Sequence, residues 1–456
     1  MDSMNTKKTF TFLGAALFMF NVNSKAQDSM SLKKNLSLQD ALEMGMQNSK
    51  SIRISNSKIN EAIANYDDAK MGRLPDASAS GGYYRINKPK IDLKFPTSSS
   101  DGSSSGTTIP NVNSLMYGMV TANYTIFAGG KIKNNIKAAN FLKNASQFDL
   151  QRDKEEIAEN IVEAYYSLYK SQAAVKLVRE NLATAQKRVK DFVRLEQNGI
   201  VAKNDLLKVQ LQESNMELSL LDAENQEKVL NYNFNLLIGL NDATKVATDS
   251  IDMTKFPNAD NANALEQAAL TNRGDIKALL EREQAAQTQI DLAKSDKLPS
   301  IGLTGGYIAM DVPHAMSITN ALNLGVGVKY DIGSLYKNKT KVKQAQAQVE
   351  TLKWNQAALE DNIKSQIFTN IQNYIEALKK LEVYQTAIQQ ADENYRVTKN
   401  KYDNSLATTT DLLDADVAKL KANIDFEYGK ADAIISYNKI NESAGTIISK
   451  YNLDNK

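Results

Sequence analysis

The sequence predicts a mostly α-helical protein with a small membrane β-barrel at one end, built from two similar halves. Three observations lead to this fold class. Two very long segments contain no glycine or proline, the order of segments in the first half recurs in the second, and each half contains stretches in which apolar and polar residues alternate. Unbroken segments of that length indicate helices, and alternation indicates strands with one apolar face.

The two long helices are expected at Lys131–Asn198 and Lys337–Asn404, which align without a gap. At 1.5 Å per residue each would extend roughly 100 Å, which is more than an ordinary globular core requires. Identical residues recur at matching positions where the two segments begin. These pairs are Tyr124 and Tyr330, Ile126 and Ile332, Lys131 and Lys337, Lys133 and Lys339, Lys137 and Lys343, and Ala139 and Ala345. The repeat indicates one body made of two similar halves.

The composition excludes several classes of function. The chain of 456 residues has a net charge of +2, which gives no indication of a nucleic-acid partner. It contains no cysteine and one histidine, so disulfides, thiol catalysis and a transition-metal site are not expected. No nucleophile, phosphate-binding or dinucleotide motif is present. We therefore predict neither an enzyme nor a cofactor.

Residues 1–26 are expected to be a secretory signal peptide. Lys7 and Lys8 precede the apolar segment Thr9–Phe20, and small residues at Ser24 and Ala26 resemble a cleavage site. The alternative is a buried N-terminal helix. No later segment has the roughly 18 apolar residues that a membrane-spanning helix needs, so the protein is expected to leave the cytoplasm without a helical anchor.

A shorter helix is expected before the strands in each half. The first covers about 36–73, with Ser37 as N-cap, Asp40 as the capping-box acid and Gly72 near its end. Its copy covers about 264–297. A Leu-Pro pair follows each of the two helices and leads into the strands.

Coiled-coil seams are expected along the distal parts of the long helices and along the helices that return from them, because apolar residues recur there every three or four positions. In the first half the seams are Val175, Val178, Leu182, Ala185, Val189, Phe192 and Leu195, and on the returning helix Leu207, Leu211, Ser214, Leu218 and Leu221. In the second half they are Leu381, Tyr384, Ile388, Ala391 and Tyr395, and then Leu413, Val417, Leu420 and Ile424. Each long helix should pair with its returning helix, which in the second half is expected to run to about Ser449.

Each half is expected to contribute two strands between its short and its long helix. The strands at 114–127 and 321–332 have one apolar face, as lipid-facing strands do, and the alternative is a soluble, half-buried hairpin. Thr97–Thr108 is expected to be an exposed hairpin loop, and His314 a loop residue. Four strands are too few for a bacterial membrane barrel, and open edges cannot face lipid, so several chains must share one barrel.

The turn segment Asn198–Asp205 and the segment Asp411–Ala415 resemble motifs of the TolC family of outer-membrane efflux proteins. The resemblance covers nearly the whole chain after the signal peptide. It implies a homotrimer with a shared twelve-stranded β-barrel in the outer membrane of a Gram-negative bacterium and an α-barrel in the periplasm. It further implies docking onto a periplasmic adaptor (membrane fusion) protein that is bound to an inner-membrane pump.

The function expected from this resemblance is that of an outer-membrane channel of a tripartite efflux or type I secretion system, which carries drugs or other export cargo. Two alternatives are a passive porin and a structural coiled-coil protein of the periplasm. The domains expected are the signal peptide 1–26, a first repeat 27–240, a linker 241–263, a second repeat 264–450 and a tail 451–456.

Four residues are candidates for a gate at the periplasmic entrance. Asp411 and Asp414 lie one helical turn apart, and in a trimer they would form rings of carboxylates that bind cations. The alternative is that they are acids favoured by the helix N-terminus. The resemblance also implies a link between Asp205 and Tyr402, whereas the family's closing arginine is replaced by Ala407.

The two helical turns are candidates for adaptor contacts. Both turns are small and largely apolar, which suits either a simple reversal of the chain or a contact with the tip of a partner hairpin. Their residues are Gly199, Ile200, Val201 and Ala202 in the first turn, and Ser405, Leu406, Ala407 and Thr408 in the second.

Overall fold

The computed structural model describes residues 33–87, 112–252, 256–257, 261–313 and 315–453. The expected signal peptide, the Thr97–Thr108 loop and His314 lie outside these residues. Within the described part of the chain, no helix is both long enough and apolar enough to cross a membrane.

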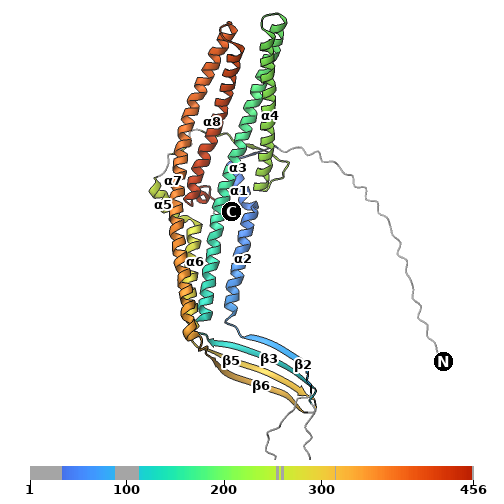
Figure 1. The fold of residues 1–456 in the computed structure, drawn as a ribbon, viewed down its shortest axis with the longest axis vertical. Helices are drawn as coiled ribbons and strands as arrows, with labels where there is room; N and C mark the ends of the chain where they lie inside the picture. Colours follow the sequence, from blue (N-terminus) through green and yellow to red (C-terminus); the bar gives the residue numbers. More distant parts are fainter. Residues whose placement is uncertain (1–32, 88–111, 253–255, 258–260, 314, 454–456) are drawn as a thin grey trace, which may run out of the picture.

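Two long helices, α3 (Lys131–Gln197) and α7 (Ser334–Asp403), run the length of the helical body. They contain 67 and 70 residues, which confirms the lengths expected from the absence of glycine and proline. At the far end of each, the chain turns and returns as α4 (Lys203–Ile238) or α8 (Thr409–Ser443). Figure 1 shows the hairpin α3/α4 and the hairpin α7/α8 extending to the same end, away from the sheet.

Each of the short helices expected at 36–73 and 264–297 is broken into two, so the prediction of one continuous helix is wrong in both halves. The four helices are α1 (Leu38–Asn48), α2 (Lys50–Met71), α5 (Ala262–Asn272) and α6 (Gly274–Ser295). The breaks occur at Ser49 and Arg273, which have ψ values of 122° and 130° and occupy equivalent positions in the repeat. The predicted capping box of Ser37 and Asp40 is confirmed.

Tertiary contacts explain the break at Arg273. Its guanidinium pairs with Asp275 at 2.7 Å and donates to the carbonyl of Ser443 at 3.0 Å. The next residue, Gly274, lies so close to α3 that a Cβ there would be 2.4 Å from the carbonyl oxygen of Phe148. The chain therefore changes direction to fit between α3 and α8.

Four antiparallel strands form a sheet at the other end of the helical body, as Figure 1 shows. They are β2 (Asp76–Arg85), β3 (Ser114–Phe127), β5 (Ser300–Val312) and β6 (Met316–Lys329). The order β2-β3-β5-β6 joins the two halves through β3 and β5, with Thr121 opposite Gly306. Four strands per chain were expected, and β2 and β6 form the two edges of this sheet.

The apolar face predicted for the last strand is exposed in the single chain. Along β6 the exposed fractions of Leu322, Leu324, Val326 and Val328 are 83%, 85%, 68% and 70%. Such a continuous exposed apolar surface is unusual in a soluble protein and is typical of a surface that contacts lipid or another protein.

A second, two-stranded sheet at mid-length was missed. The strand β1 (Lys33–Leu36) pairs in parallel with β4 (Lys245–Thr248), which lies inside the segment 241–263 that was expected to link the two halves. The hydroxyl of Tyr165 supports this pair, because it donates to the carbonyl of Leu36 at 2.9 Å and accepts from the amide of Asp249 at 2.8 Å. Such contacts join residues far apart in sequence, which local patterns do not reveal.

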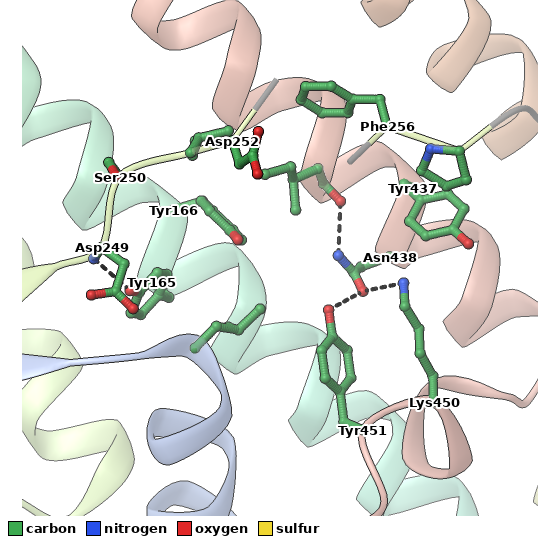
Figure 2. Close-up of a pocket in the computed structure, with 14 residues that line it drawn as sticks. Tyr165, Tyr166, Asp249, Ser250, Asp252, Phe256, Tyr437, Asn438, Lys450 and Tyr451 are labelled. Atoms are coloured by element: carbon green, nitrogen blue, oxygen red, sulfur yellow. Dashed lines mark hydrogen bonds between the residues drawn. The ribbon is translucent and has the colours of Figure 1, made fainter. Parts of the chain in front are cut away.

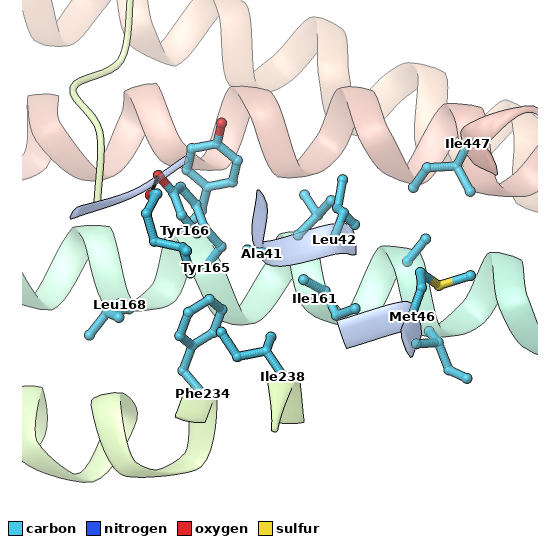
Figure 3. Close-up of a cluster of buried hydrophobic side chains, with 14 of the residues drawn as sticks. Ala41, Leu42, Met46, Ile161, Tyr165, Tyr166, Leu168, Phe234, Ile238 and Ile447 are labelled. Atoms are coloured by element: carbon cyan, nitrogen blue, oxygen red, sulfur yellow. Dashed lines mark hydrogen bonds between the residues drawn. The ribbon is translucent and has the colours of Figure 1, made fainter. Parts of the chain in front are cut away.

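The largest apolar core lies at the same level, where α1, α3, α4 and the C-terminal segment meet (Figure 3). Leu42, Ile161, Phe234 and Ile447 are buried there. The helix expected to reach about Ser449 ends instead at Ser443. A short helix, α9 (Ile447–Lys450), then follows and packs Ile447 into this core.

The seam expected on α4 does not face α3. Four of its apolar residues are exposed by more than half: Leu207, Leu211, Leu218 and Leu221. The contacts to α3 are made by the neighbouring positions Leu206, Val209 and Met216, which are buried. The seam on α3 is confirmed at Val175, Val178, Leu182, Ala185 and Phe192. The apolar stripe on α4 therefore has no partner within the described chain.

Candidate functional site

The two turns at the hairpin tips have the same backbone geometry. After α3, the amides of Gly199 and Ile200 donate to the carbonyls of Glu196 and Leu195, both at 2.9 Å. After α7, the amides of Ser405 and Leu406 make the equivalent bonds at 2.9 and 2.7 Å. This is the Schellman pattern, which needs a left-handed residue after the helix. Gly199 has φ +72° and Ser405 has φ +61°.

Each turn presents one large apolar side chain to solvent. Ile200 is 68% exposed and Leu406 is 76% exposed, and they occupy the same position in the two turns. Val201 packs against the apolar cluster at the tips, whereas Ala202 is exposed and begins α4 without a side-chain cap. The tips therefore carry two exposed apolar contacts that the hairpins themselves do not use.

Helix α8 begins with a capping box formed by Thr408 and Asp411. The carboxylate Oδ2 of Asp411 accepts from the amide and the hydroxyl of Thr408 at 2.8 and 2.7 Å, and the amide of Asp411 donates to the same hydroxyl at 3.2 Å. These hydrogen bonds from Thr408 lower the pKa of Asp411. Asp411 therefore has the structural role given above as the alternative: it is an acid that stabilises a helix N-terminus.

Asp411 and Asp414 are both exposed at the start of α8. Their spacing of three residues places them near one face of the helix. The capping bonds fix the orientation of the Asp411 carboxylate, because both use its Oδ2 atom. How Asp411 and Asp414 are arranged around a channel is set by the packing of neighbouring chains in an oligomer.

Tyr402 lies between the two hairpins. Its ring stacks on Phe192 of α3, with centroids 5.9 Å apart and an interplanar angle of 14°. Around this pair lies an apolar cluster that includes Leu206 and Val209 of α4 and Leu413 of α8. Burial raises the pKa of Tyr402, and a hydrogen bond with the Thr409 side chain opposes this shift.

Asp205 acts on Tyr402 through its charge, which also raises the pKa of the tyrosine. The tyrosine hydroxyl is hydrogen bonded to Thr409, and the carboxylate of Asp205 pairs with Lys208 at 3.6 Å. Lys208 in turn donates to the hydroxyl of Thr410 at 3.2 Å, so this chain of contacts joins α4 to α8. The two residues expected to form a link therefore lie in one electrostatic environment, and their role in gating stays a prediction.

Sequence reasoning missed the most buried ion pair between the hairpins. Arg188 of α3 and Asp416 of α8 approach to 3.0 Å, and their side chains are only 9% and 6% exposed. The guanidinium also contacts the hydroxyl of Tyr395 at 3.4 Å, so one side chain reaches both α7 and α8. Asn181 is 3.5 Å from the other carboxylate oxygen of Asp416.

A sequence signal for this pair existed. Arg188 falls between Ala185 and Phe192 at three- and four-residue spacing, so a charged side chain stands on the edge of an apolar seam. A buried charge needs a partner, which makes such a position a candidate for an ion pair. Several acids on α8 were possible partners, and only the packing of the two helices selects Asp416.

A cavity of about 670 Å³ lies at mid-length, away from the tips (Figure 2). At its wall the Oδ1 atom of Asn438 accepts from the Lys450 ammonium at 3.2 Å and from the Tyr451 hydroxyl at 2.8 Å. The ammonium also lies 3.8 Å from the centre of the Tyr437 ring, and burial lowers the pKa of Lys450 to about 8. The polar groups on this wall bond to one another, and we assign no catalytic role to them.

Comparison with known proteins places the chain in one family. The family model described as "Outer membrane efflux protein" matches residues 41–239 and 265–446, which include both hairpins and all four strands of the sheet. Among curated proteins, outer membrane efflux protein BepC of Brucella suis is 22% identical over 251 residues, 54% of each chain. Outer membrane protein TolC of Vibrio cholerae is 22% identical over 318 residues, 67% of this chain and 72% of its own.

Solved structures share the fold. The outer membrane protein VceC of Vibrio cholerae superposes with a TM-score of 0.73 at 17% identity, covering 90% of this chain and 96% of its own. The CmeC outer membrane channel of Campylobacter jejuni gives 0.75 at 17% identity, covering 90% and 86%. The expected combination of a long helical body and a four-stranded sheet is confirmed. By its family match and its fold, the chain belongs to the outer membrane efflux protein family.

Proposed function

We propose that this chain is the outer membrane channel of a tripartite efflux or type I secretion system and works as a homotrimer. It receives drugs or other export cargo from a periplasmic adaptor protein and an inner-membrane pump and releases them outside the cell. The relatives BepC and TolC are described as outer membrane efflux and outer membrane proteins, and the match to BepC spans about half of that protein.

The observation that carries the proposal is the four-stranded sheet with an exposed apolar face and two open edges. Strands β2 and β6 each pair on one side only, so their outer edges have no strand partner within the described chain. Unpaired backbone groups are not stable in lipid, so an apolar sheet of four strands must close with strands of other chains. Pairing of β6 in one chain with β2 in the next gives twelve strands in a trimer.

The stripe on α4 supports the same assembly. Four leucines on that helix are more than half exposed and recur at helical spacing: Leu207, Leu211, Leu218 and Leu221. A neighbouring copy that covers this stripe would bury the seam that the sequence predicted. The long helices would then form a wall that continues below the barrel for roughly 100 Å.

The exposed tips suit the proposed contact with an adaptor. Ile200 and Leu406 present apolar side chains on rigid turns, and a helical hairpin tip of a partner would cover both. Next to these turns, Asp411 and Asp414 would form carboxylate rings at the channel entrance. The contacts of Lys208 with Asp205 and Thr410, and the stacking of Tyr402 on Phe192, would hold the hairpins together. The resting channel would then be narrow and would bind cations.

Single-particle imaging of the detergent-extracted protein tests the proposal. We expect a three-fold particle longer than roughly 100 Å with a barrel at one end. A porin would lack the long helical part, and its conductance would not depend on residues at the tips. A monomer, or a filament recovered without detergent, would contradict the channel and leave a coiled-coil scaffold.

A further inference from the structure

The long helices begin with lysines that the channel function does not explain. The same three positions carry lysine in both halves: Lys131, Lys133 and Lys137 in α3, and Lys337, Lys339 and Lys343 in α7. All six are exposed, and neither helix has an acidic residue in its first turn. Both helices begin beside the sheet, as Figure 1 shows, so the six lysines lie where the strands meet the helical body.

These positions are unfavourable for the helices alone. The N-terminal end of a helix carries a partial positive charge over its first turn, which disfavours the cations there, Lys131 and Lys133 in α3 and Lys337 in α7. Lys133 and Lys137 are four residues apart, as are Lys339 and Lys343, and like charges at that spacing destabilise a helix. The duplicated halves both keep this arrangement, so a compensating anion is expected.

The chain supplies such an anion for only part of the group. Asp296, at the end of α6, pairs with Lys131 at 2.5 Å and with Lys341 at 2.9 Å, and these bonds lower the pKa of its carboxyl group. Among the described residues, no acid forms an ion pair with the other five lysines of the group; the ammonium of one of them, Lys337, lies 5.9 Å from the centre of the Tyr336 ring. We call the remaining four, Lys133, Lys137, Lys339 and Lys343, the unpaired lysines.

The surface next to the unpaired lysines is apolar and aromatic. Tyr336 is 71% exposed, and its spacing of three and seven residues places it on the helix face of Lys339 and Lys343. Just before it, Ile332 is 68% exposed and continues the apolar face of β6. Tyrosines beside long cationic side chains are typical of the boundary between the hydrocarbon core and the headgroups of a bilayer.

We propose that the unpaired lysines bind the headgroups of anionic phospholipids in the leaflet that surrounds the helical end of the barrel. This inference rests on the proposed membrane placement of the sheet. The lipid phosphates would supply the negative charge that the unpaired lysines lack, while the acyl chains would contact the apolar face of the strands. Each basic residue near a membrane surface adds to the attraction toward anionic lipid.

Lipid titration of the purified oligomer tests this proposal. Native mass spectrometry in a neutral detergent would measure apparent affinities for phosphatidylglycerol and phosphatidylcholine. We expect the wild type to prefer phosphatidylglycerol by at least about tenfold, and this preference to fall as ionic strength rises. The variant Lys133→Gln, Lys137→Gln, Lys339→Gln, Lys343→Gln should lose most of it.

A matched control changes the same number of exposed lysines far from the sheet: Lys176→Gln, Lys187→Gln, Lys190→Gln and Lys379→Gln. This control should keep the preference of the wild type. If the first variant fails to assemble, the doubles Lys133→Gln, Lys137→Gln and Lys339→Gln, Lys343→Gln test each half separately, and each should lose part of the preference.

Three results would overturn the inference: no phosphatidylglycerol preference in the wild type, an unchanged preference in the variant, or an equal loss in the distal control. Conductance measured in a pure phosphatidylcholine bilayer distinguishes failure of the lipid-binding inference from failure of the proposed channel function. A conducting wild type without lipid preference contradicts the inference alone, whereas a protein that neither inserts nor conducts contradicts both. Altered ion selectivity with unchanged lipid preference would assign the lysines to the lumen instead.

Discussion

The two hairpin tips have the same turn but stabilise it in different places. Gly199 adopts its left-handed conformation with φ +72° at low cost, whereas Ser405 adopts φ +61° with a side chain present. The returning helices show the reverse, because the uncapped helix follows the glycine and the capped helix follows the serine. Helix α4 begins after Ala202 without a side-chain cap, and α8 begins with the capping box of Thr408 and Asp411.

The two tips are therefore stabilised at different points: the first by the glycine that ends its long helix, and the second by the capping box that starts its returning helix. In the first hairpin the helix end is relaxed and the start of the next helix is uncapped. In the second, the helix end contains a left-handed serine, and the next helix start is held by three hydrogen bonds. The capped start is also the one that carries Asp411 and Asp414, so rigidity and negative charge coincide in the second tip.

The largest expected effect comes from breaking the connection between the two hairpins. Replacing Arg188 with Met leaves Asp416 buried without its charged partner, which should cost about 3–5 kcal/mol in local stability. Hydrogen exchange of the α8 amides near Asp416 would measure the free energy of opening. Changing Asp416 to Leu in the same chain should recover much of the loss.

The exposed pair Arg396 and Glu393 provides the control for this prediction, since both side chains are more than half exposed. Replacing Arg396 with Met should change stability by less than about 1 kcal/mol. Equal costs at Arg188 and Arg396 would show that the buried pair does not join the hairpins.

The second prediction concerns the charge of the second tip. The double variant Asp411→Ala, Asp414→Ala should abolish block of the channel by a multivalent cation without loss of the trimer, because the proposed carboxylate rings disappear. Single-channel conductance with and without the cation measures this. Thr408→Ala removes the cap but keeps both acids, so its block should persist. A double variant that is still blocked would rule out the rings.

A smaller effect is expected from the hydroxyl of Tyr402. Tyr402→Phe removes the hydrogen bond with the Thr409 side chain, at a cost of about 1 kcal/mol. The resting conductance of the channel should rise as the tips loosen. Thr409→Val removes the same bond and should act in the same direction. An unchanged closed-state conductance in both variants would separate Tyr402 from gating.

The smallest effects exchange the residues that distinguish the turns. Gly199→Ala should destabilise the first tip by about 1 kcal/mol through the backbone alone, since a Cβ at Gly199 would meet no atom within 4 Å. Ser405→Gly should stabilise the second tip by about 0.5 kcal/mol. Thermal unfolding of the two variants measures both signs. Shifts of the same sign would mean that φ does not govern these turns.

The sequence alone determined the parts of this protein that depend on short-range rules. The long helices follow from segments without glycine or proline, and both turns follow from residues that end helices or tolerate positive φ. The capping box of Ser37 and Asp40, the four strands, and an apolar face on two of these strands were also predicted. The internal repeat supported the predicted helices, turns and strands, because a pattern present in both halves arises by chance less often than a pattern present once.

Tertiary structure decided the features in which distant segments meet. The break at Arg273, the pairing of β1 with β4 and the ion pair of Arg188 with Asp416 all depend on neighbours far along the chain. The seam of α4 faced away from α3 because two faces of that helix are apolar, and spacing alone does not say which face packs inside the chain. The physical reason is that periodicity fixes which residues share a face, while only packing fixes what that face meets.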